Sequence, residues 1–160
     1  MNAKLRDTMA FILKTYPDNM MSEMSNARLT KMVYLGDWKS VLGTGKQITP
    51  IQWYFDNYGP YVDDVKNLAH KQPQIFKVEQ TTNMYGQPKR VFDVVGNPSC
   101  DTLTEHEKSA LSSVIDTTSK LYWAPFIKLV YATHPIASSE RYSYLNLVEK
   151  AEEYKKLQSA

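Results

Sequence analysis

The sequence is short of features that would place it in particular classes of protein. It has a single cysteine, Cys100, so no disulfide can form within the chain, which fits a reducing compartment. It has no apolar run of the ~18 residues that suggests a membrane-spanning helix, and its first residues lack the apolar core of a signal peptide. We therefore expect a cytoplasmic protein with no membrane partner.

An excess of one charge is also absent. The chain has 19 basic and 17 acidic residues, which gives a formal net charge of +2. Its basic pairs, residues 89–90 and 155–156, form no continuous stripe, because acidic residues intervene. This pattern predicts no strong attraction to nucleic acid.

The composition is that of an ordinary globular protein. The chain has 160 residues, of which 42% are apolar and 22% charged. Folding at this length buries roughly 70% of the surface of the unfolded chain, enough for a core without disulfides or metals. No internal repeat or long linker divides the sequence, so residues 1–160 are expected to form one domain.

Apolar residues recur at spacings of three and four, which predicts amphipathic helices. The first helix is expected over residues 5–16. The second begins at Ser25 or Asn26, either of which can cap it, and is stopped by Gly43 and Gly45.

Three further helices are expected in the second half of the chain. A capping box between Thr104 and Glu107 opens the first, and Pro125 lies near the start of the next. Residues 144–159 form an amphipathic C-terminal helix. Its apolar stripe contains Leu147, Val148, Ala151 and Tyr154.

A small β element is expected between these helices. Residues 74–80 and 90–95 alternate apolar with polar side chains and predict a hairpin. The aromatic segment 53–64 is interpreted as a strand that runs through Gly59 into a short helix opened by Pro60. The fold class is therefore α+β: a helix-dominated compact single domain with a small antiparallel β-hairpin.

No constellation in the sequence indicates catalysis, a metal or a cofactor. The three histidines, His70, His106 and His134, stand at none of the spacings of a metal site. His134, before a proline, is interpreted as hydrogen-bonding a turn. Adjacent acidic pairs point about 100° apart on a helix and do not face one site. We expect a protein that is not an enzyme.

Lys31 and Asp37 stand six residues apart on the second predicted helix. They are either solvated or form buried polar contacts that organise the core, and both readings are structural.

Tyrosine is abundant, with 11 residues beside 3 Trp and 5 Phe. Because a tyrosine hydroxyl needs water or a partner, tyrosine suits interfaces as well as the edges of cores. Several aromatic residues fall at expected loops or element ends. The candidates for binding a partner are Tyr58, Tyr61, Tyr85, Tyr122 and Trp123.

Three segments, in this order, carry a resemblance to the Panacea domain, the SocA-like antitoxin family. They are "LTKMVYLGDWKS" (29–40), "WYFDNYGPYV" (53–62) and the segment 103–136. Gly36 stands where the family usually has Ala, and Tyr61 stands where Val often follows the Gly-Pro pair. The matching positions are Leu29, Lys31, Tyr34, Leu35, Asp37, Tyr58, Gly59, Pro60, Leu103, Thr133 and His134.

The resemblance covers about residues 5–136 and leaves 137–160 as a C-terminal helical extension. It implies an antitoxin that neutralises a toxin enzyme by direct binding, and in some members a protease receives the toxin. Such domains occur in bacteria and in phage or prophage genomes. Two alternatives stay open: a phage-encoded inhibitor of a host defence protein, and an enzyme or small-ligand binder with a pocket near Tyr58, Lys31 and His134.

Overall fold

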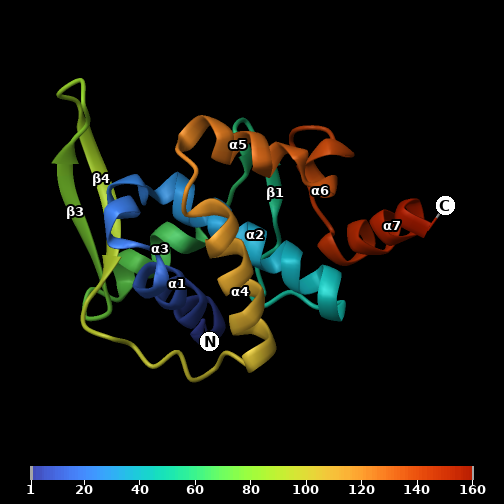
Figure 1. Cartoon of the computed structure of the whole chain (residues 1–160), viewed down its shortest axis with the longest axis horizontal. Coiled ribbons are helices and arrows are strands. Elements are labelled where there is room, and N and C mark those ends of the chain that lie inside the picture. Colours follow the sequence, from blue (N-terminus) through green and yellow to red (C-terminus); the bar gives the residue numbers. More distant parts are fainter. Residues whose placement is uncertain (1, 160) are drawn as a thin grey trace.

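A long helix, α2 (Asn26–Thr44), lies in the middle of the computed structural model, which describes residues 2–159 (Figure 1). Thirteen of its nineteen residues are buried, so neighbours cover it on almost every side. A helix buried all round must satisfy its polar side chains inside the protein. The helices that contact it are α1 (Ala3–Thr15), α3 (Asp64–Lys71), α4 (Glu105–Thr118) and α7 (Leu147–Ser159).

Two small antiparallel sheets and three short helices complete the fold. A three-stranded sheet has the order β2–β1–β5, and β3 pairs with β4 in a separate hairpin at the left of Figure 1. The helix-dominated α+β class is thus confirmed. These elements are η1 (Asp18–Glu23), β1 (Tyr54–Asp56), β2 (Gly59–Pro60), β3 (Phe76–Thr82), β4 (Pro88–Val94), α5 (Trp123–Ala132), α6 (His134–Ala137) and β5 (Ser143–Tyr144).

Local capping residues set the ends of the main helices, much as the sequence predicts. The Ser25 hydroxyl accepts a hydrogen bond from the backbone N–H of Arg28 at 3.2 Å and caps α2. Gly45 ends α2 in the left-handed conformation, at φ 81°. The capping box of Thr104 and Glu107 at the start of α4 is confirmed with both hydrogen bonds.

Three details of the sequence interpretation are wrong. Gly43 does not stop α2, because the helix continues to Thr44. Pro60 does not open a helix: Gly59 has φ 105° and reverses the chain, so that Pro60 pairs with Phe55 in the sheet. Val148 is 41% exposed, because α7 packs through neighbouring positions, including Leu147 and Ala151.

Gly36 lies where α2 packs closely against Leu111 of α4. A Cβ atom placed on it would lie 2.6 Å from Cδ2 of the buried Leu111, closer than any real contact. We expect Gly36→Ala to lower the free energy of unfolding by about 1–3 kcal/mol, although alanine favours helix. Chemical denaturation measures this change.

Gly43→Ala is the matched control on the same helix. Its Cβ would meet only the ring of the exposed His106, at 3.2 Å, and this ring can move aside. The control should be neutral or stabilising by up to ~1 kcal/mol. Equal effects of the two substitutions would mean that α2 and α4 are not in close contact at Gly36.

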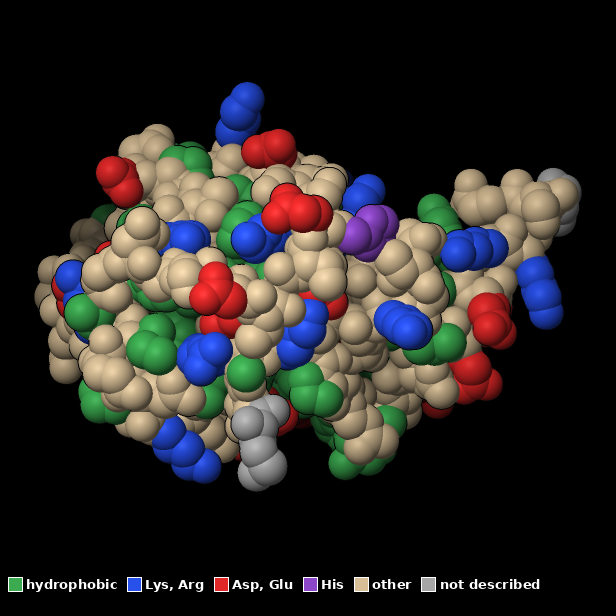
Figure 2. Space-filling view, turned by 90° about the horizontal axis from the view of Figure 1, so that it is seen from below, with side chains coloured by type: hydrophobic (Ala, Val, Ile, Leu, Met, Phe, Trp, Pro, Cys, Tyr) green, Lys and Arg blue, Asp and Glu red, His purple; other side chains and the backbone are tan. Residues whose placement is uncertain are grey.

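The surface carries mixed charge. Figure 2 shows one face of the molecule, on which Lys and Arg side chains are scattered among Asp and Glu side chains and neither sign forms a large patch. Figures 1 and 2 both show the end of α7 projecting from the body. Among residues 2–159, no helix has the length and apolar character needed to cross a membrane.

Candidate functional site

Asp37, one of the positions that match the family, is buried and forms the centre of a hydrogen-bond network with the loop that follows α2. Its side chain is fully buried, and burial raises the pKa to about 6, against the opposing effect of hydrogen bonds from Thr49, Trp53 and Ile48. The carboxylate accepts five hydrogen bonds: from Ile48 N (2.9 Å), Thr49 N (2.9 Å), Thr49 Oγ1 (2.6 Å), Trp53 Nε1 (2.9 Å) and Gln47 Nε2 (3.3 Å).

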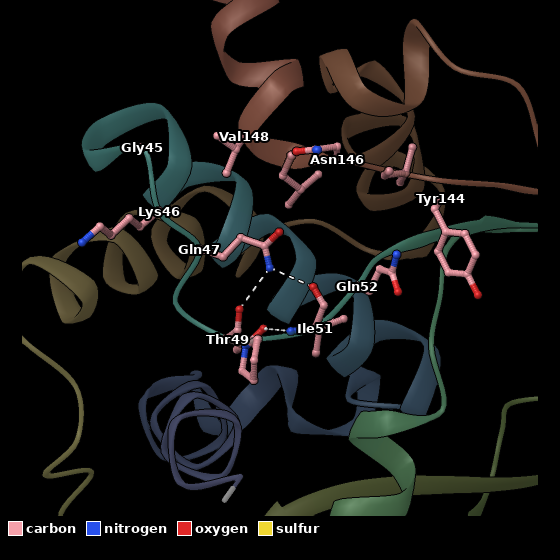
Figure 3. Close-up of a pocket in the computed structure, with 12 residues that line it drawn as sticks. Gly45, Lys46, Gln47, Thr49, Ile51, Gln52, Tyr144, Asn146 and Val148 are labelled. Carbon is pink, nitrogen blue, oxygen red and sulfur yellow. Dashed lines mark hydrogen bonds between the residues drawn. The ribbon is translucent and has the colours of Figure 1, made fainter.

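The loop held by Asp37 forms one wall of a surface hollow of about 520 Å³ (Figure 3). Gln47 continues the network by donating to the carbonyl oxygens of Thr49 (3.0 Å) and Ile51 (2.9 Å). The opposite wall comes from residues 144–148, at the start of α7. Among the described residues that line the hollow, Lys46 is the one with a charge, so they include no set of acids and bases arranged for proton transfer.

Tyr34 links α2 to the end of α5. Its hydroxyl and the Thr133 hydroxyl form a hydrogen bond of 2.8 Å, and its ring meets the ring of Trp53 edge-on at 5.5 Å. Burial raises the pKa of the Tyr34 phenol, so it stays neutral. The structure thus brings Tyr34, Asp37 and Thr133 of the family-like positions together through the core.

Lys31 is 2% exposed and is the buried polar contact that the sequence left open. Its Nζ lies 5.9 Å from the ring centroid of Tyr61, and a Cβ on Gly59 would be 3.6 Å from its Cε. Burial lowers its pKa to about 8, and the charge of Asp56 opposes this shift. The Gly-Pro corner therefore packs over the lysine.

The pKa of Lys31 predicts an unusual dependence of stability on pH. The folded value of about 8 lies below that of an unfolded lysine, so between these values the unfolded state binds more protons. The contribution of Lys31 to stability therefore rises as the pH increases above 8. We expect Lys31→Met to raise the free energy of unfolding by roughly 1–3 kcal/mol at pH 7 and to abolish the increase in stability above pH 8. Urea unfolding of both proteins between pH 7 and 10 measures it, and identical pH slopes would show a solvated ammonium.

Arg28 is a buried site that sequence reasoning missed. Its Nη2 donates to the Tyr16 hydroxyl (2.7 Å) and to the carbonyl oxygens of Thr118 (3.0 Å) and Leu121 (2.7 Å). Its Cζ lies 4.3 Å from the ring centroid of Phe126 on α5. Within residues 2–159 its Nε and Nη1 have no hydrogen-bond partner. One cation thus joins α1, α2, α5 and the C-terminal end of α4.

The sequence carries a weak signal that Arg28 is buried. It stands one helical turn before Met32 and two before Leu35, both of which are buried. An arginine in an apolar stripe of this kind is a candidate for burial with hydrogen-bonded carbonyls.

Four of the five predicted contact residues are well exposed, but they do not form one patch. Tyr58 (78%) lies in the β1–β2 turn, Tyr85 (81%) at the tip of the β3–β4 hairpin, and Tyr122 (66%) and Trp123 (43%) at the start of α5. Tyr61 differs: it is half-buried.

The hydroxyl of Tyr61 is already engaged. It accepts from Asn26 Nδ2 at 3.0 Å and donates to Asp63 Oδ1 at 3.1 Å. Burial raises its pKa, and Asp63 adds to this rise. Tyr61 therefore closes the corner over Lys31.

Tyr142 joins Tyr58 at the exposed end of the three-stranded sheet. Its hydroxyl donates to Asn57 Oδ1 at 2.6 Å, and it is 61% exposed. Its φ of 68° lies in the left-handed region, which a bulky residue rarely adopts. Such strain is retained where surrounding contacts hold it, and it is common at functional positions.

His134 lies apart from Tyr58 and Lys31. Its Nε2 is 2.8 Å from Glu153 Oε1, and its ring centroid is 5.5 Å from that of Tyr154, so it fastens α6 to α7. This hydrogen bond holds the pKa of Glu153 below its usual value. The contacts found within residues 2–159 do not bring Tyr58, Lys31 and His134 together: His134 is turned to α7, while Lys31 lies under the Gly59 corner.

The fold and its buried network define a helix-dominated α+β protein whose family-like side chains are mostly internal. The chain belongs to the family described as antitoxin SocA-like, Panacea domain, whose model matches residues 29–135. No curated protein and no solved structure matches the chain. The resemblance read from three segments is thus confirmed, and the family description implies an antitoxin role and a toxin partner. The match ends before α7.

Proposed function

We propose that this protein is an antitoxin that neutralises a cognate toxin enzyme by direct binding in the cytoplasm of a bacterial cell. The observation that carries the proposal is a contrast between buried and exposed side chains. Lys31, Tyr34 and Asp37 are buried and engaged with their own protein, whereas Tyr58, Tyr85 and Tyr122 are each more than 60% exposed. The family description supports an antitoxin rather than an enzyme.

Exposed tyrosine and tryptophan are the side chains that most often anchor protein interfaces. Each covers a large area with few rotatable bonds and offers one polar group. A stable complex buries roughly 1,200–2,000 Å² in total, and a few anchors supply most of its binding energy. The exposed aromatic residues on the β1–β2 turn, the hairpin tip and α5 offer such anchors at three places.

Expression with the product of the adjacent gene tests the proposal. We expect that product to arrest growth alone, growth to recover when the present chain is co-expressed, and the two proteins to co-purify. Replacing Tyr58, Tyr85 and Trp123 together by alanine should weaken binding by about 100-fold or more. Asp116→Asn, at an exposed position of α4, is the control and should leave binding unchanged.

Two results would contradict the proposal. One is that the adjacent product is harmless and does not bind. The other is that the complex forms but the toxin remains fully active in it.

A further inference from the structure

The β3–β4 hairpin extends away from the helical body. β3 forms the outer margin of the molecule and β4 lies between β3 and the helices (Figure 1). The tip carries two large apolar side chains, Met84 and Tyr85, which are 87% and 81% exposed. Exposed apolar side chains on a protruding arm suit contact with another molecule better than packing within the chain.

The hydrogen bonds at the two ends of the hairpin show which backbone N–H and C=O groups point toward the partner strand and which point away from it. Val95 N donates to Ile75 O at 2.7 Å, and Asn83 N donates to Gln87 O at 2.9 Å. Hydrogen-bonded pairs alternate along an antiparallel ladder. The register therefore turns the N–H and C=O groups of the alternate β3 residues away from β4. These residues are Phe76, Val78, Gln80 and Thr82.

The outer edge of β4 is already protected. Phe92 N donates to Met24 O at 2.8 Å, next to η1. Pro88, at another outward position, has no N–H to offer, and Arg90 places a charge between them. Contact with the body, a proline and a charged residue are the usual means by which natural sheets block an edge.

On β3 the charged residues Lys77 and Glu79 stand at the positions that pair with β4, and among its outward positions that the structure describes only the first has a backbone hydrogen bond to the body. Phe76 N is used by Gln72 O at 3.0 Å. Within residues 2–159, no backbone partner is found for the outward groups of Val78, Gln80 and Thr82. These three residues are uncharged, and two of them are β-branched, which favours an extended chain.

We propose that an extended segment of the toxin adds to β3 as a further strand, while Met84 and Tyr85 pack against the surface next to that segment. This inference rests on the proposed function and names the surface that performs it. The outward groups at 78, 80 and 82 supply donors and acceptors at every second residue, as strand addition requires. The partner is thus a protein with an open strand or an extended loop, not a helix or nucleic acid.

Two proline substitutions, at facing positions of β3 and β4, test whether a strand adds to β3. Gln80 and Arg90 face each other in the register, and the N–H groups of both point outward. Gln80→Pro removes a donor from the open edge of β3, whereas Arg90→Pro makes the same change on the edge of β4. Neither breaks a hydrogen bond between the strands, and Pro88 shows that the hairpin holds proline at such a position.

We expect Gln80→Pro to weaken binding of the adjacent gene's product about tenfold or more, and Arg90→Pro to change it less than threefold. Arg90→Gln separates the loss of charge from the effect of proline. Met84→Ala with Tyr85→Ala should weaken binding by a further tenfold or so. Circular dichroism and thermal unfolding confirm that each variant is folded before calorimetry measures its affinity.

The outcomes separate this inference from the proposed function. If the unaltered protein binds the toxin and the two proline variants weaken binding equally, strand addition to β3 is wrong while the antitoxin function stands. If the unaltered protein does not bind, the proposed function is wrong and this inference falls with it. A selective loss in Gln80→Pro supports both.

Discussion

Replacing Asp37 by asparagine is expected to lower the free energy of unfolding by about 3–5 kcal/mol. The two carboxylate oxygens accept all five hydrogen bonds of the network. An amide keeps the shape of the side chain but turns one acceptor into a donor. If its NH₂ replaces Oδ1, two backbone N–H groups lose their acceptor. If it replaces Oδ2, the donors from Thr49, Trp53 and Gln47 lose theirs.

Guanidinium or urea titration with far-UV circular dichroism measures this change. Asp116→Asn makes the same substitution on the exposed face of α4 and should alter stability by less than ~0.5 kcal/mol. Because Trp53 donates to Asp37, its fluorescence should also change in the folded Asp37→Asn protein. A loss below about 1 kcal/mol would show that the five donors find other acceptors.

Arg28→Ala is expected to destabilise the protein by at least about 3 kcal/mol. The substitution empties a fully buried volume and removes the donor to the carbonyl oxygens of Thr118 and Leu121 at the end of α4. It also ends the stacking on Phe126, which holds α5. These losses exceed the gain from no longer burying a cation without a carboxylate, because each buried acceptor left unpaired costs about 1–3 kcal/mol.

Two further substitutions sharpen the test of Arg28. Arg28→Lys keeps the charge but lacks the flat fork that stacks and donates at once, so it should recover only part of the loss. Arg90→Ala, on the exposed edge of β4, should be nearly neutral. If Arg28→Ala unfolds at the same denaturant concentration as the native sequence, the clamp between α4 and α5 contributes nothing to stability.

The sequence predicts the long elements well, because their signals repeat over many residues. The buried positions Leu111, Val114 and Ile115 of α4 follow directly from helical spacing, and the capping box marks where α4 begins. The β3–β4 hairpin follows from alternation over two strands of seven residues each. In such segments the local pattern and the tertiary packing agree.

The short elements escape prediction because two or three residues show no period. β2 and β5 have two residues each, and both exist through pairing with β1. The conformation of Gly59 decides the path of the chain at Pro60, and a proline after a glycine is equally compatible with the first turn of a helix. The sheet therefore combines a local reversal at Gly59 with the pairing of β1 and β5, which are far apart in sequence.

The residues of the candidate site also differ in how well the sequence predicts them. The sequence leaves open whether Lys31 and Asp37 are buried. The partners of Asp37 lie 10–16 residues away in an irregular loop, which has no sequence period. For Arg28 the helical spacing gives only a weak signal of burial, because its three acceptors belong to Tyr16, Thr118 and Leu121, which are distant in sequence or outside its helix. The exposed tyrosines were easier to place, because turns and element ends carry their own sequence signals.

The buried network around Asp37 and the open edge of β3 share no residue. The interior carries most of the positions by which the family is recognised. Phe76 and Phe92, at the base of the hairpin, are also buried, whereas residues 79–90 are mostly exposed and lie outside the core. If β3 binds the toxin as proposed, replacing residues 79–90 alone would redirect this scaffold to a new toxin, and partner choice would then be separable from the fold.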